Sequence, residues 1–438
     1  MTSKSITREA PPQGALVIHP DRDGRGSARS SQARLEEAVG LAEALDLIVA
    51  DAIIAPLRKL TPATLFGSGK VDEIGALCHE LDVDVAVVDD ALTPVQQRNL
   101  EKAWKVKVID RTGLILEIFA RRARTREGRL QVELARLSYE RSRLVRTWTH
   151  LERQRGGFGV MGGPGETQIE TDRRLLADKI GKLKRELTEV RRTRDLQRGA
   201  RQRHPFPAVA LVGYTNAGKS TLFNRLTNSE VMAEDMLFAT LDPTLRMLNL
   251  PDGRPAILSD TVGFISDLPH ELVESFRATL EEVKEADVIL HVRDIASEET
   301  EAEAEDVRAV LERLGVDVQE RNVIEVWNKA DLVDAELARD LAGDARRHHP
   351  PAVLISAVTG EGCDALLAAI ARIVDDAPPV SVHATAEQGA AVAWLYRHGR
   401  VMDRVDDEDG GVRLAVRLTA QALGQFEQRF PGADLTPL

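Results

Sequence analysis

The sequence predicts an α/β protein of several domains, built around parallel β-sheets with helices on both sides. Its 438 residues are too many for one ordinary hydrophobic core and suggest about three domains. Short apolar runs alternate with helical patterns in two separate regions, which is typical of parallel strands joined by helices. A glycine-rich loop, Gly213 to Thr221, follows one of these runs and precedes a helical pattern. This loop marks the second region as the candidate functional domain.

The composition is that of a globular protein. Hydrophobic residues make up 43% and charged residues 29% of the chain, and no apolar run reaches the roughly 18 residues of a membrane span. The first residues lack an apolar segment of the signal-peptide type. Cys78 and Cys363 are expected to be small buried side chains, since two distant cysteines form neither a disulfide framework nor a zinc site. We therefore expect a cytoplasmic protein without membrane insertion.

The charge is unevenly distributed along the chain. The net charge is −12, yet residues 121–203 carry 23 Lys and Arg against 11 Asp and Glu. A basic block inside an acidic protein is the pattern expected of a surface that contacts phosphate backbone. The alternative is a charged, solvated surface on a plain spacer.

The first domain is expected within residues 31–120. Residues 1–30 are polar and rich in Gly, Ser, Arg and Pro, so we expect a disordered tail. Between helical patterns lie three strand-like runs, at 46–54, 84–90 and 106–110, which predict a small parallel α/β domain. The sequence FGSGK, Phe66 to Lys70, lacks the spacer of a phosphate loop and is expected to be a turn that opens a helix.

Residues 121–203 are expected to form a helical hairpin. Apolar residues recur at steps of four and three from Leu130 to Leu151, and again from Leu176 to Val190. Two helices with one narrow apolar stripe each should pair as an antiparallel coiled coil. The connection, Gly156 to Glu166, is glycine-rich and so expected to be a flexible tip. This basic hairpin is the candidate RNA contact.

Residues 204–376 carry the signature of a nucleotide-binding domain. The loop GYTNAGKST matches the phosphate-loop pattern in its required place between a strand and a helix. In such loops the backbone N–H groups surround the phosphates, the lysine neutralises their β and γ oxygens, and the hydroxyl after it binds Mg²⁺. Lys219 and Ser220 occupy these two positions.

Two further segments complete the expected phosphate site. Asp260 ends the strand-like run AILSD, as expected of a carboxylate beside Mg²⁺, and the Gly263 N–H is placed to sense the γ-phosphate. Thr240, in LFATLDPT, is the candidate switch threonine that completes the Mg²⁺ shell when GTP is bound. We expect Ser220, Thr240 and Asp260 to form the metal site, with Lys219, Thr240 and Gly263 as the catalytic residues.

The base is expected to be guanine. NKAD, Asn328 to Asp331, follows a strand-like run, and the Asp331 carboxylate can accept hydrogen bonds from guanine N1–H and its 2-amino group. Adenine offers neither donor. Lys329 is expected to pack over the base, and the Ala357 N–H to lie near guanine O6. The full predicted nucleotide site is Gly213, Tyr214, Thr215, Asn216, Ala217, Gly218, Lys219, Ser220, Thr221, Phe238, Ala239, Thr240, Leu241, Asp242, Asp260, Thr261, Val262, Gly263, Asn328, Lys329, Asp331, Ser356, Ala357 and Val358.

One residue departs from the usual GTPase pattern. Where many GTPases have a glutamine that orients the attacking water, this chain has Phe264. We therefore expect slow intrinsic hydrolysis, with the missing group supplied by another part of the chain, a partner or a cation. Asn216 is a candidate ligand for a potassium ion, as in related GTPases with Asn at this position. The alternative is an ordinary turn residue.

Residues 380–438 are expected to form a small α+β domain. They follow a predicted linker at Ala377 to Pro379 and contain two helical patterns, with two strand-like runs around the turn DEDGG. No chemistry-bearing motif is evident in this domain.

From about residue 30 to the end, the sequence resembles the HflX family of ribosome-associated GTPases. The resemblance rests on FGSGKVDEI, the basic coiled coil, GGPGETQIETDRR, GYTNAGKST, LFATLDPT, DTVGFI and NKAD. It implies a GTPase stimulated by ribosomes that binds the large subunit and its rRNA, directs its hairpin toward the peptidyl-transferase region, and splits stalled or idle ribosomes under stress. A monomer, partly ribosome-associated, is expected.

Two other functions fit the same sequence. The chain is alternatively a regulatory switch whose coiled coil binds a protein, or a GTPase that assists RNA modification. GTP-dependent, steeply salt-dependent association with ribosomes distinguishes the ribosome-binding function from the regulatory switch, because neutralised phosphates release counterions. A stable complex with a modification enzyme would favour the RNA-modification function.

Overall fold

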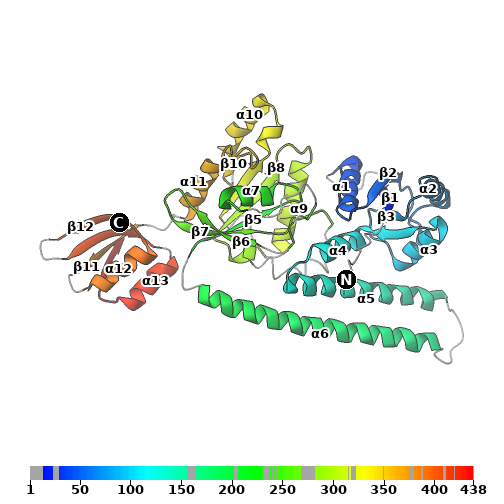
Figure 1. Ribbon diagram of the computed structural model, residues 1–438, viewed down its shortest axis with the longest axis horizontal. Helices are drawn as coiled ribbons and strands as arrows, with labels where there is room; N and C mark the ends of the chain where they lie inside the picture. The colour runs from blue at the N-terminus through cyan, green and yellow to red at the C-terminus, as the bar shows by residue number, and fades with distance from the viewer. Residues whose placement is uncertain are drawn as a thin grey trace, which may run out of the picture.

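Three globular units stand in a row, and a long helical hairpin runs beneath two of them (Figure 1). The computed structural model describes residues 13–22, 29–154, 164–201, 206–229, 237–238, 240–241, 244–267, 282–313, 315–316, 322–348, 350–374, 379–385, 388–407, 411–418 and 420–437. The N-terminal domain lies at one end, the GTPase-like domain in the middle and a small C-terminal domain at the other end (Figure 1).

The N-terminal domain is a four-stranded parallel sheet in the order β2-β1-β3-β4. Helices α1 and α4 pack on one face of this sheet, and α2 and α3 pack on the other. Its elements are β1 (Gly14–Asp21), α1 (Ser31–Glu43), β2 (Ile48–Pro56), α2 (Ser68–Glu80), β3 (Val85–Val88), α3 (Pro94–Trp104), β4 (Lys107–Asp110) and α4 (Arg111–Arg122).

Strand β1 corrects one expectation. Residues 1–30 were expected to be a disordered tail, but Gly14–Asp21 forms a central strand that pairs with β2 on one side and β3 on the other. Ala15 to Ile18 are completely buried. The expectation was wrong because the polar residues around this short apolar run dominated the composition, whereas two neighbouring strands decide its structure. Residues 1–12 and 23–28 lie outside the described part of the chain.

The FGSGK segment opens a helix, as predicted. Helix α2 begins at Ser68 directly after Gly67. Phe66 is buried and lies 6.4 Å from Trp104 between ring centroids. The segment thus holds α2 against α3.

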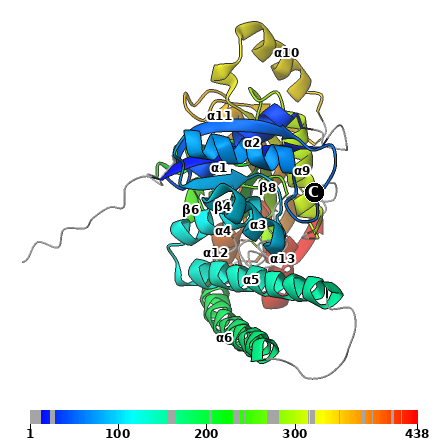
Figure 2. The same cartoon turned by 90° about the vertical axis from the view of Figure 1, so that its right-hand side faces the viewer.

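The basic segment forms the predicted pair of helices, α5 (Arg126–Gln154) and α6 (Pro164–Arg201). They run antiparallel along the underside of the N-terminal and GTPase-like domains (Figures 1 and 2). Leu137, Ile180 and Leu183 are buried between them, and Leu130, Leu134 and Leu176 pack against these three. Of the expected flexible tip, residues 156–163 lie outside the described residues.

A polar cluster fixes α5 to the N-terminal domain. Asp110 caps the start of α4 by accepting a hydrogen bond of 2.8 Å from the Gly113 N–H. The Tyr139 hydroxyl of α5 contacts both Asp110 carboxylate oxygens, at 2.8 and 2.7 Å, and Arg143 Nη1 donates to the same group at 3.1 Å. The hairpin is therefore joined to the end of β4.

The middle domain is a six-stranded sheet in the order β10-β9-β8-β5-β7-β6, parallel except for β6. Helices α7 and α11 pack on one face and α9 on the other. Its elements are β5 (Ala208–Gly213), α7 (Lys219–Thr227), β6 (Thr244–Asn249), β7 (Pro255–Asp260), β8 (Val288–Asp294), α9 (Thr300–Arg313), β9 (Val323–Asn328), η1 (Ala330–Leu332), α10 (Ala335–Ala345), β10 (Ala352–Leu354) and α11 (Cys363–Val374).

One apolar cluster is shared between the N-terminal and middle domains. It contains Leu114 and Phe119 of α4 together with Phe238, Phe264 and Val307 of the middle domain. The rings of Phe119 and Phe238 meet edge to face, with centroids 4.6 Å apart. A continuous core of this kind fixes how the two domains sit against each other.

The C-terminal domain is a four-stranded antiparallel sheet, in the order β12-β13-β11-β14, with two helices on one face. Its elements are β11 (Pro379–Ala384), α12 (Gly389–His398), β12 (Arg400–Asp406), β13 (Val412–Arg417), α13 (Ala420–Arg429) and β14 (Asp434–Pro437). Two strands had been expected. The others were missed because β14 is short and β11 begins at Pro379, in the predicted linker. Proline is tolerated at the first position of a strand.

None of the helices among the described residues is long and apolar enough to cross a membrane.

Candidate functional site: a GTP-binding cleft

The phosphate loop joins β5 to α7 and depends on two glycines. At Gly213 (φ 155°) a Cβ atom would lie 2.2 Å from the Val292 carbonyl oxygen, and at Gly218 (φ 89°) it would lie 2.2 Å from Asn328 Nδ2. No other residue type fits either position without moving the backbone. These glycines let the loop turn tightly into the first turn of α7, whose N–H groups attract anions.

Lys219 is held inside the loop. It is 6% exposed, and its Nζ donates a hydrogen bond to the Tyr214 carbonyl oxygen at 2.5 Å. Burial lowers the pKa of Lys219 to about 8, against the opposing attraction of Asp260. The negative charge of a bound triphosphate would favour the protonated form of Lys219, which burial disfavours. The position therefore suits a lysine that neutralises phosphate.

Three oxygen-bearing side chains meet where the sequence predicts the metal ion. Ser220 Oγ and Thr240 Oγ1 lie 2.8 Å apart, and both donate to Asp260 Oδ2, at 2.8 and 3.0 Å. Adjacent ligands of an octahedral Mg²⁺ at about 2.1 Å are separated by about 3 Å. Burial raises the pKa of Asp260, and its Oδ1 is buried without a hydrogen-bond partner in the structure. The donor set fits a small, hard cation and its water ligands.

The segment after Asp260 lies directly on the phosphate loop. The Phe264 N–H donates to the Gly213 carbonyl at 3.1 Å, and the Thr215 N–H donates to the Phe264 carbonyl at 2.7 Å. A Cβ at Gly263 would come within 3.1 Å of Lys219 Nζ. Gly263 is thus beside Lys219, which fits the prediction that its N–H senses the γ-phosphate.

The Phe264 side chain lies in the interior of the protein. It is 3% exposed and belongs to the apolar cluster shared with the N-terminal domain. Its side chain is a packing group between domains, which agrees with the prediction that it does not orient water.

Asn328 ties the base-binding segments to the phosphate loop. It is 2% exposed; its Nδ2 donates to the Ala217 carbonyl at 2.8 Å and its Oδ1 accepts from the Ala357 N–H at 2.9 Å. Lys329 has a left-handed backbone (φ 68°), and its Nζ pairs with Asp294 at 2.7 Å. Asp331 lies exposed in η1. These contacts bring NKAD and SAV to one end of the phosphate loop.

The remaining predicted site residues differ in burial and in position. Phe238, Leu241 and Val262 have buried side chains in the shared apolar cluster. Thr261 Oγ1 donates to the Leu211 carbonyl at 2.6 Å, Ser356 is fully buried, and Val358 is 65% exposed. Thr221 lies in the first turn of α7. Ala239 and Asp242 lie outside the described residues.

Asn216 is compatible with both sequence interpretations. It has φ 59°, a left-handed conformation that Asn tolerates well. It also lines a cavity of about 470 Å³ together with Tyr214, Thr215, Asp294 and residues of the N-terminal domain. The potassium role of Asn216 stays a prediction.

Sequence reasoning missed two features of the site. Asp294, the partner of Lys329, ends strand β8, and its place at a strand end was the only available signal. The second feature is the side chain of Tyr214, which was expected to contribute only to the loop. Its hydroxyl faces Glu37 and Ser266, and nothing in the sequence connects these three positions.

Comparison with known proteins identifies the family. The chain is 50% identical over 427 residues to the GTPase HflX of Magnetococcus marinus, which covers 96% of both chains. This chain belongs to the HflX family of GTPases. It is also 45% identical to the GTPase HflX of Escherichia coli over 361 residues, covering 82% of this chain and 83% of that one.

Family models match the chain in the same order as its structural units. They are "GTP-binding GTPase N-terminal" at residues 32–120, "GTP-binding GTPase Middle Region" at 122–201, "50S ribosome-binding GTPase" at 208–329 and "HflX C-terminal domain" at 342–435. Among solved structures, a GTP-binding protein from Sulfolobus solfataricus in complex with GDP aligns with 82% of this chain and 98% of its own, at 24% identity and a TM-score of 0.44.

As an HflX-family GTPase, the protein binds GTP and hydrolyses it. The cleft described above is the candidate site of this reaction, because the phosphate loop, the side-chain oxygens of Ser220, Thr240 and Asp260, and the base-binding segments meet there. The GTPase fold and the α/β class predicted from the sequence are confirmed.

Proposed function

We propose that this HflX-family chain is a GTP-operated factor that binds the large ribosomal subunit, through its rRNA, and splits or rescues stalled and idle ribosomes under stress. The observation that carries the proposal is the basic hairpin joined rigidly to a domain that touches the GTP site. One matched family model is described as a 50S ribosome-binding GTPase, which supports the same partner.

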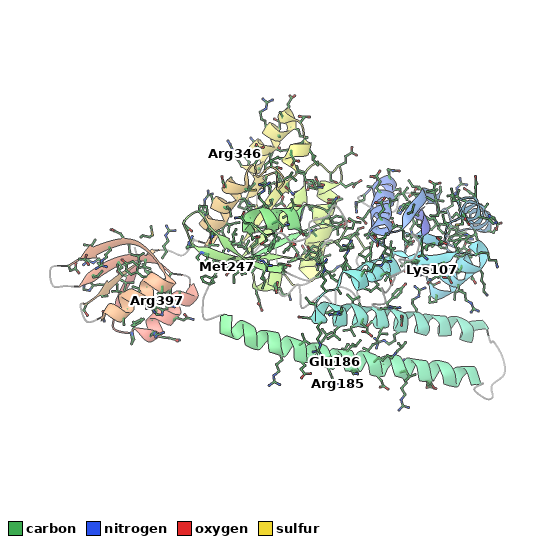
Figure 3. The ribbon with its side chains drawn as sticks, in the orientation of Figure 1. Lys107, Arg185, Glu186, Met247, Arg346 and Arg397 are labelled. Carbon is green, nitrogen blue, oxygen red and sulfur yellow. The ribbon has the colours of Figure 1, made fainter. Side chains whose placement is uncertain are left out.

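The hairpin has the shape and charge of an RNA-binding arm. Helices α5 and α6 extend along one side of the molecule, away from the base-binding end of the cleft (Figure 1). Lys182, Lys184 and Arg185 are exposed on α6, and Arg185 points outward from the hairpin (Figure 3). Exposed cations on a rigid rod suit a groove lined with phosphates.

GTP would set the binding-competent arrangement. In the proposed site, Ser220, Thr240 and Asp260 would hold Mg²⁺, and the ion would supply charge neutralisation of the β- and γ-phosphates. Asp331 selects guanine and the Gly263 N–H contacts the γ-phosphate. Loss of that phosphate releases Thr240 and Gly263, so that hydrolysis resets the factor.

Hydrolysis is expected to be slow without a partner. The Phe264 ring is buried between domains and no side chain replaces the usual glutamine at this position. A ribosome-bound state would supply the missing group or order the site, so ribosomes are expected to stimulate turnover. Splitting would then be driven by binding energy rather than by hydrolysis itself.

The decisive experiment is cosedimentation with purified large subunits. We expect association with a non-hydrolysable GTP analogue, little association with GDP, and a binding constant that falls steeply with salt because bound phosphates release counterions. Absence of analogue-dependent association would contradict the proposal. A stable complex with an RNA-modifying enzyme or another protein would favour the alternative functions.

A pair of charge variants tests the role of the hairpin. Arg185→Glu, on the exposed side of α6, is expected to weaken association with the large subunit by about tenfold at low salt. Arg346→Glu is the matched control, since Arg346 is equally exposed but lies beyond the end of α10, on the opposite side of the molecule from the hairpin (Figure 3). Equal loss in both variants would show that only net charge matters.

A further inference from the structure

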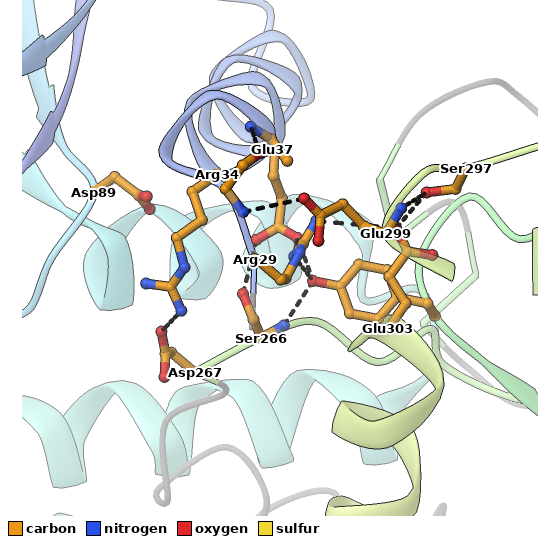
Figure 4. A network of polar contacts seen from close by, with 12 residues as sticks. Arg29, Arg34, Glu37, Asp89, Ser266, Asp267, Ser297, Glu299 and Glu303 are labelled. Atoms are coloured by element: carbon orange, nitrogen blue, oxygen red, sulfur yellow. Dashed lines mark hydrogen bonds and ion pairs between the residues drawn. The ribbon is translucent and has the colours of Figure 1, made fainter. Parts of the chain in front are cut away.

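A buried polar cluster lies where the N-terminal domain meets the GTPase domain (Figure 4). It joins Glu37 of α1 and Arg111 of α4 to Tyr214 of the phosphate loop and Ser266, three residues after Gly263. The four residues are between 4% and 7% exposed. We call these four residues the interdomain cluster.

Every member of the interdomain cluster contacts the loop that follows Gly263, or a residue that holds it. The Tyr214 hydroxyl donates to the Glu37 carboxylate and accepts a hydrogen bond from the Ser266 N–H at 2.9 Å. Ser266 Oγ donates to Glu37 Oε1 at 3.0 Å. Arg111 Nη2 donates to the carbonyl oxygen and Oγ of Ser266, each at 3.0 Å. The N-terminal domain therefore forms hydrogen bonds with both main-chain and side-chain atoms of this loop.

The buried charge of Glu37 is stabilised only if its partners keep their positions. Burial alone would raise the pKa of Glu37, but the attraction of Arg111 and Arg29 outweighs it and holds the pKa below its usual value. Glu37 is thus a buried carboxylate that is stable only while its partners are in place. A displacement of Ser266 would leave several buried polar groups unsatisfied, each at a substantial cost.

The segment that contains Ser266 also contains Gly263, the proposed γ-phosphate sensor. Gly263 lies beside Lys219, and Phe264 is held to the phosphate loop by the two backbone hydrogen bonds already described. In the same structure, Ser220 and Thr240 have the spacing of adjacent Mg²⁺ ligands, which belongs to the GTP form. The intact interdomain cluster therefore coincides with a GTP-type arrangement of the site.

We propose that the interdomain cluster lets the N-terminal domain read the γ-phosphate. GTP fixes Gly263, which keeps Ser266 in contact with Glu37 and Arg111, and loss of the γ-phosphate moves the loop and breaks these contacts. Because linkage is reciprocal, the same contacts make the protein favour GTP over GDP. Glu37 and Arg111 are then positioning residues that act through Ser266 and Tyr214. This inference rests on GTP binding and not on the proposed ribosome function.

The residue directly before Arg111 connects the interdomain cluster to the hairpin. Arg111 follows Asp110, the residue that holds Tyr139 and Arg143 of α5. Two consecutive residues at the junction of β4 and α4 thus contact the nucleotide-sensing loop and the hairpin. A movement of the loop after Gly263 would therefore displace Arg111, and through its neighbour Asp110 it would reach the hairpin.

Equilibrium binding of fluorescent nucleotides to the full chain tests the inference. In Glu37→Gln, which keeps the shape of the side chain and removes its charge, the affinity for a non-hydrolysable GTP analogue is expected to fall about tenfold, the loss of a hydrogen bond to a charged group. The affinity for GDP stays within about twofold, because GDP does not fix Gly263. Ser266→Ala, which removes one hydroxyl, shifts the same ratio by about threefold.

The matched control is Glu43→Gln, the same change at the exposed C-terminal end of α1, away from the phosphate loop. It is expected to leave both affinities unchanged. An unchanged ratio in Glu37→Gln and Ser266→Ala, or an equal loss for both nucleotides, overturns the inference, because a merely structural role weakens both. If thermal unfolding shows that Glu37→Gln does not fold, Ser266→Ala decides alone. If the ratio of GTP-analogue to GDP affinity shifts as expected but the protein does not bind ribosomes, only the proposed function is contradicted.

Discussion

At the scale of single residues, Asp331 is the proposed determinant of base choice. If its carboxylate accepts two hydrogen bonds from guanine, Asp331→Asn, which replaces an acceptor by a donor on one side, is expected to lower the affinity for GDP by about 100-fold. The same variant should gain affinity for xanthosine diphosphate, whose 2-oxo group accepts the new N–H. Competition binding with the two nucleotides measures the exchange.

Asp334→Asn is the control for that variant. Asp334 caps α10 by accepting from the N–H groups of Glu336 and Leu337, at 3.0 and 2.8 Å, and lies three residues from Asp331. Since Asn is an equally good cap, base preference and stability should both be retained. A similar loss of GDP affinity in the control would mean that Asp331 does not select the base.

Asn216 provides a second prediction at the residue scale. If its amide binds potassium beside the phosphates, GTP turnover is faster in potassium than in sodium buffer. Asn216→Gly should remove that difference, because Gly keeps the left-handed backbone (φ 59°) and deletes only the amide. Turnover is measured as released phosphate in each buffer. Equal rates in both buffers for the unsubstituted chain would leave Asn216 as a turn residue.

His291 predicts how acid affects the GTPase domain. Burial lowers its pKa to about 4, against the attraction of Glu325 on β9 and with the repulsion of Arg293, Arg308 and Lys219. The unfolded state therefore binds the proton first, and the free energy of unfolding should fall by about 3 kcal/mol as the pH drops from about 6.5 to 4.

Denaturant unfolding at several pH values checks the prediction for His291. His291→Leu removes the titrating group and is expected to flatten the curve between pH 6.5 and 4. An identical slope in both proteins would assign the acid sensitivity to other groups.

At the scale of elements, β1 is the strand on which the N-terminal domain depends. Ile18 is fully buried in this central strand, whereas Ile48 is 56% exposed at the start of the edge strand β2. Ile18→Ala is expected to lower the free energy of unfolding by about 2 to 5 kcal/mol, and Ile48→Ala by under about 1 kcal/mol. Chemical denaturation followed by hydrogen exchange in the N-terminal domain measures both. Equal effects would be inconsistent with a central β1.

The contacts that link the hairpin to the cleft are made by residues at the junctions between strands and helices. Asp110 and Arg111 mark the junction of β4 and α4, and the phosphate loop marks that of β5 and α7. In parallel sheets such junctions gather at one edge, which is where ligands bind. The carboxyl end of β4 in the N-terminal sheet lies against the GTPase domain. A domain without a nucleotide motif of its own therefore contacts the candidate GTP site.

At the scale of the whole molecule, the apolar clusters predict how the protein unfolds. One cluster is shared by the N-terminal and GTPase domains, and the C-terminal domain has a separate cluster around Trp394 and Phe426. Calorimetry is expected to show the first two domains unfolding together and the C-terminal domain in its own transition. Phe119→Ala, in the N-terminal domain, should lower the midpoint of the joint transition by several degrees.

The control for this experiment is Phe426→Ala, a fully buried ring in the C-terminal cluster. It is expected to shift only the C-terminal transition. A shift of both transitions by either variant would show that the clusters are not independent.

Much of the chemistry could be predicted from the sequence because it depends on short segments. The phosphate loop needs Gly213 and Gly218 at fixed spacing from Lys219, and the base needs Asp331 next to a strand end; both requirements are local and leave a pattern. The paired helices also followed from local periodicity. These features define the fold class, the GTP site and a basic hairpin.

The contacts between domains required the tertiary structure. Glu37, Arg111, Tyr214 and Ser266 are up to 229 residues apart in the chain, and a charged residue on a helix is by itself indistinguishable from a surface group. Strand β1 was missed for the same reason, since a short apolar run becomes a central strand only through its neighbours. The sequence determined what binds in the cleft; only packing of distant segments decided which domain senses it, because buried charges are stabilised by partners that no local pattern encodes.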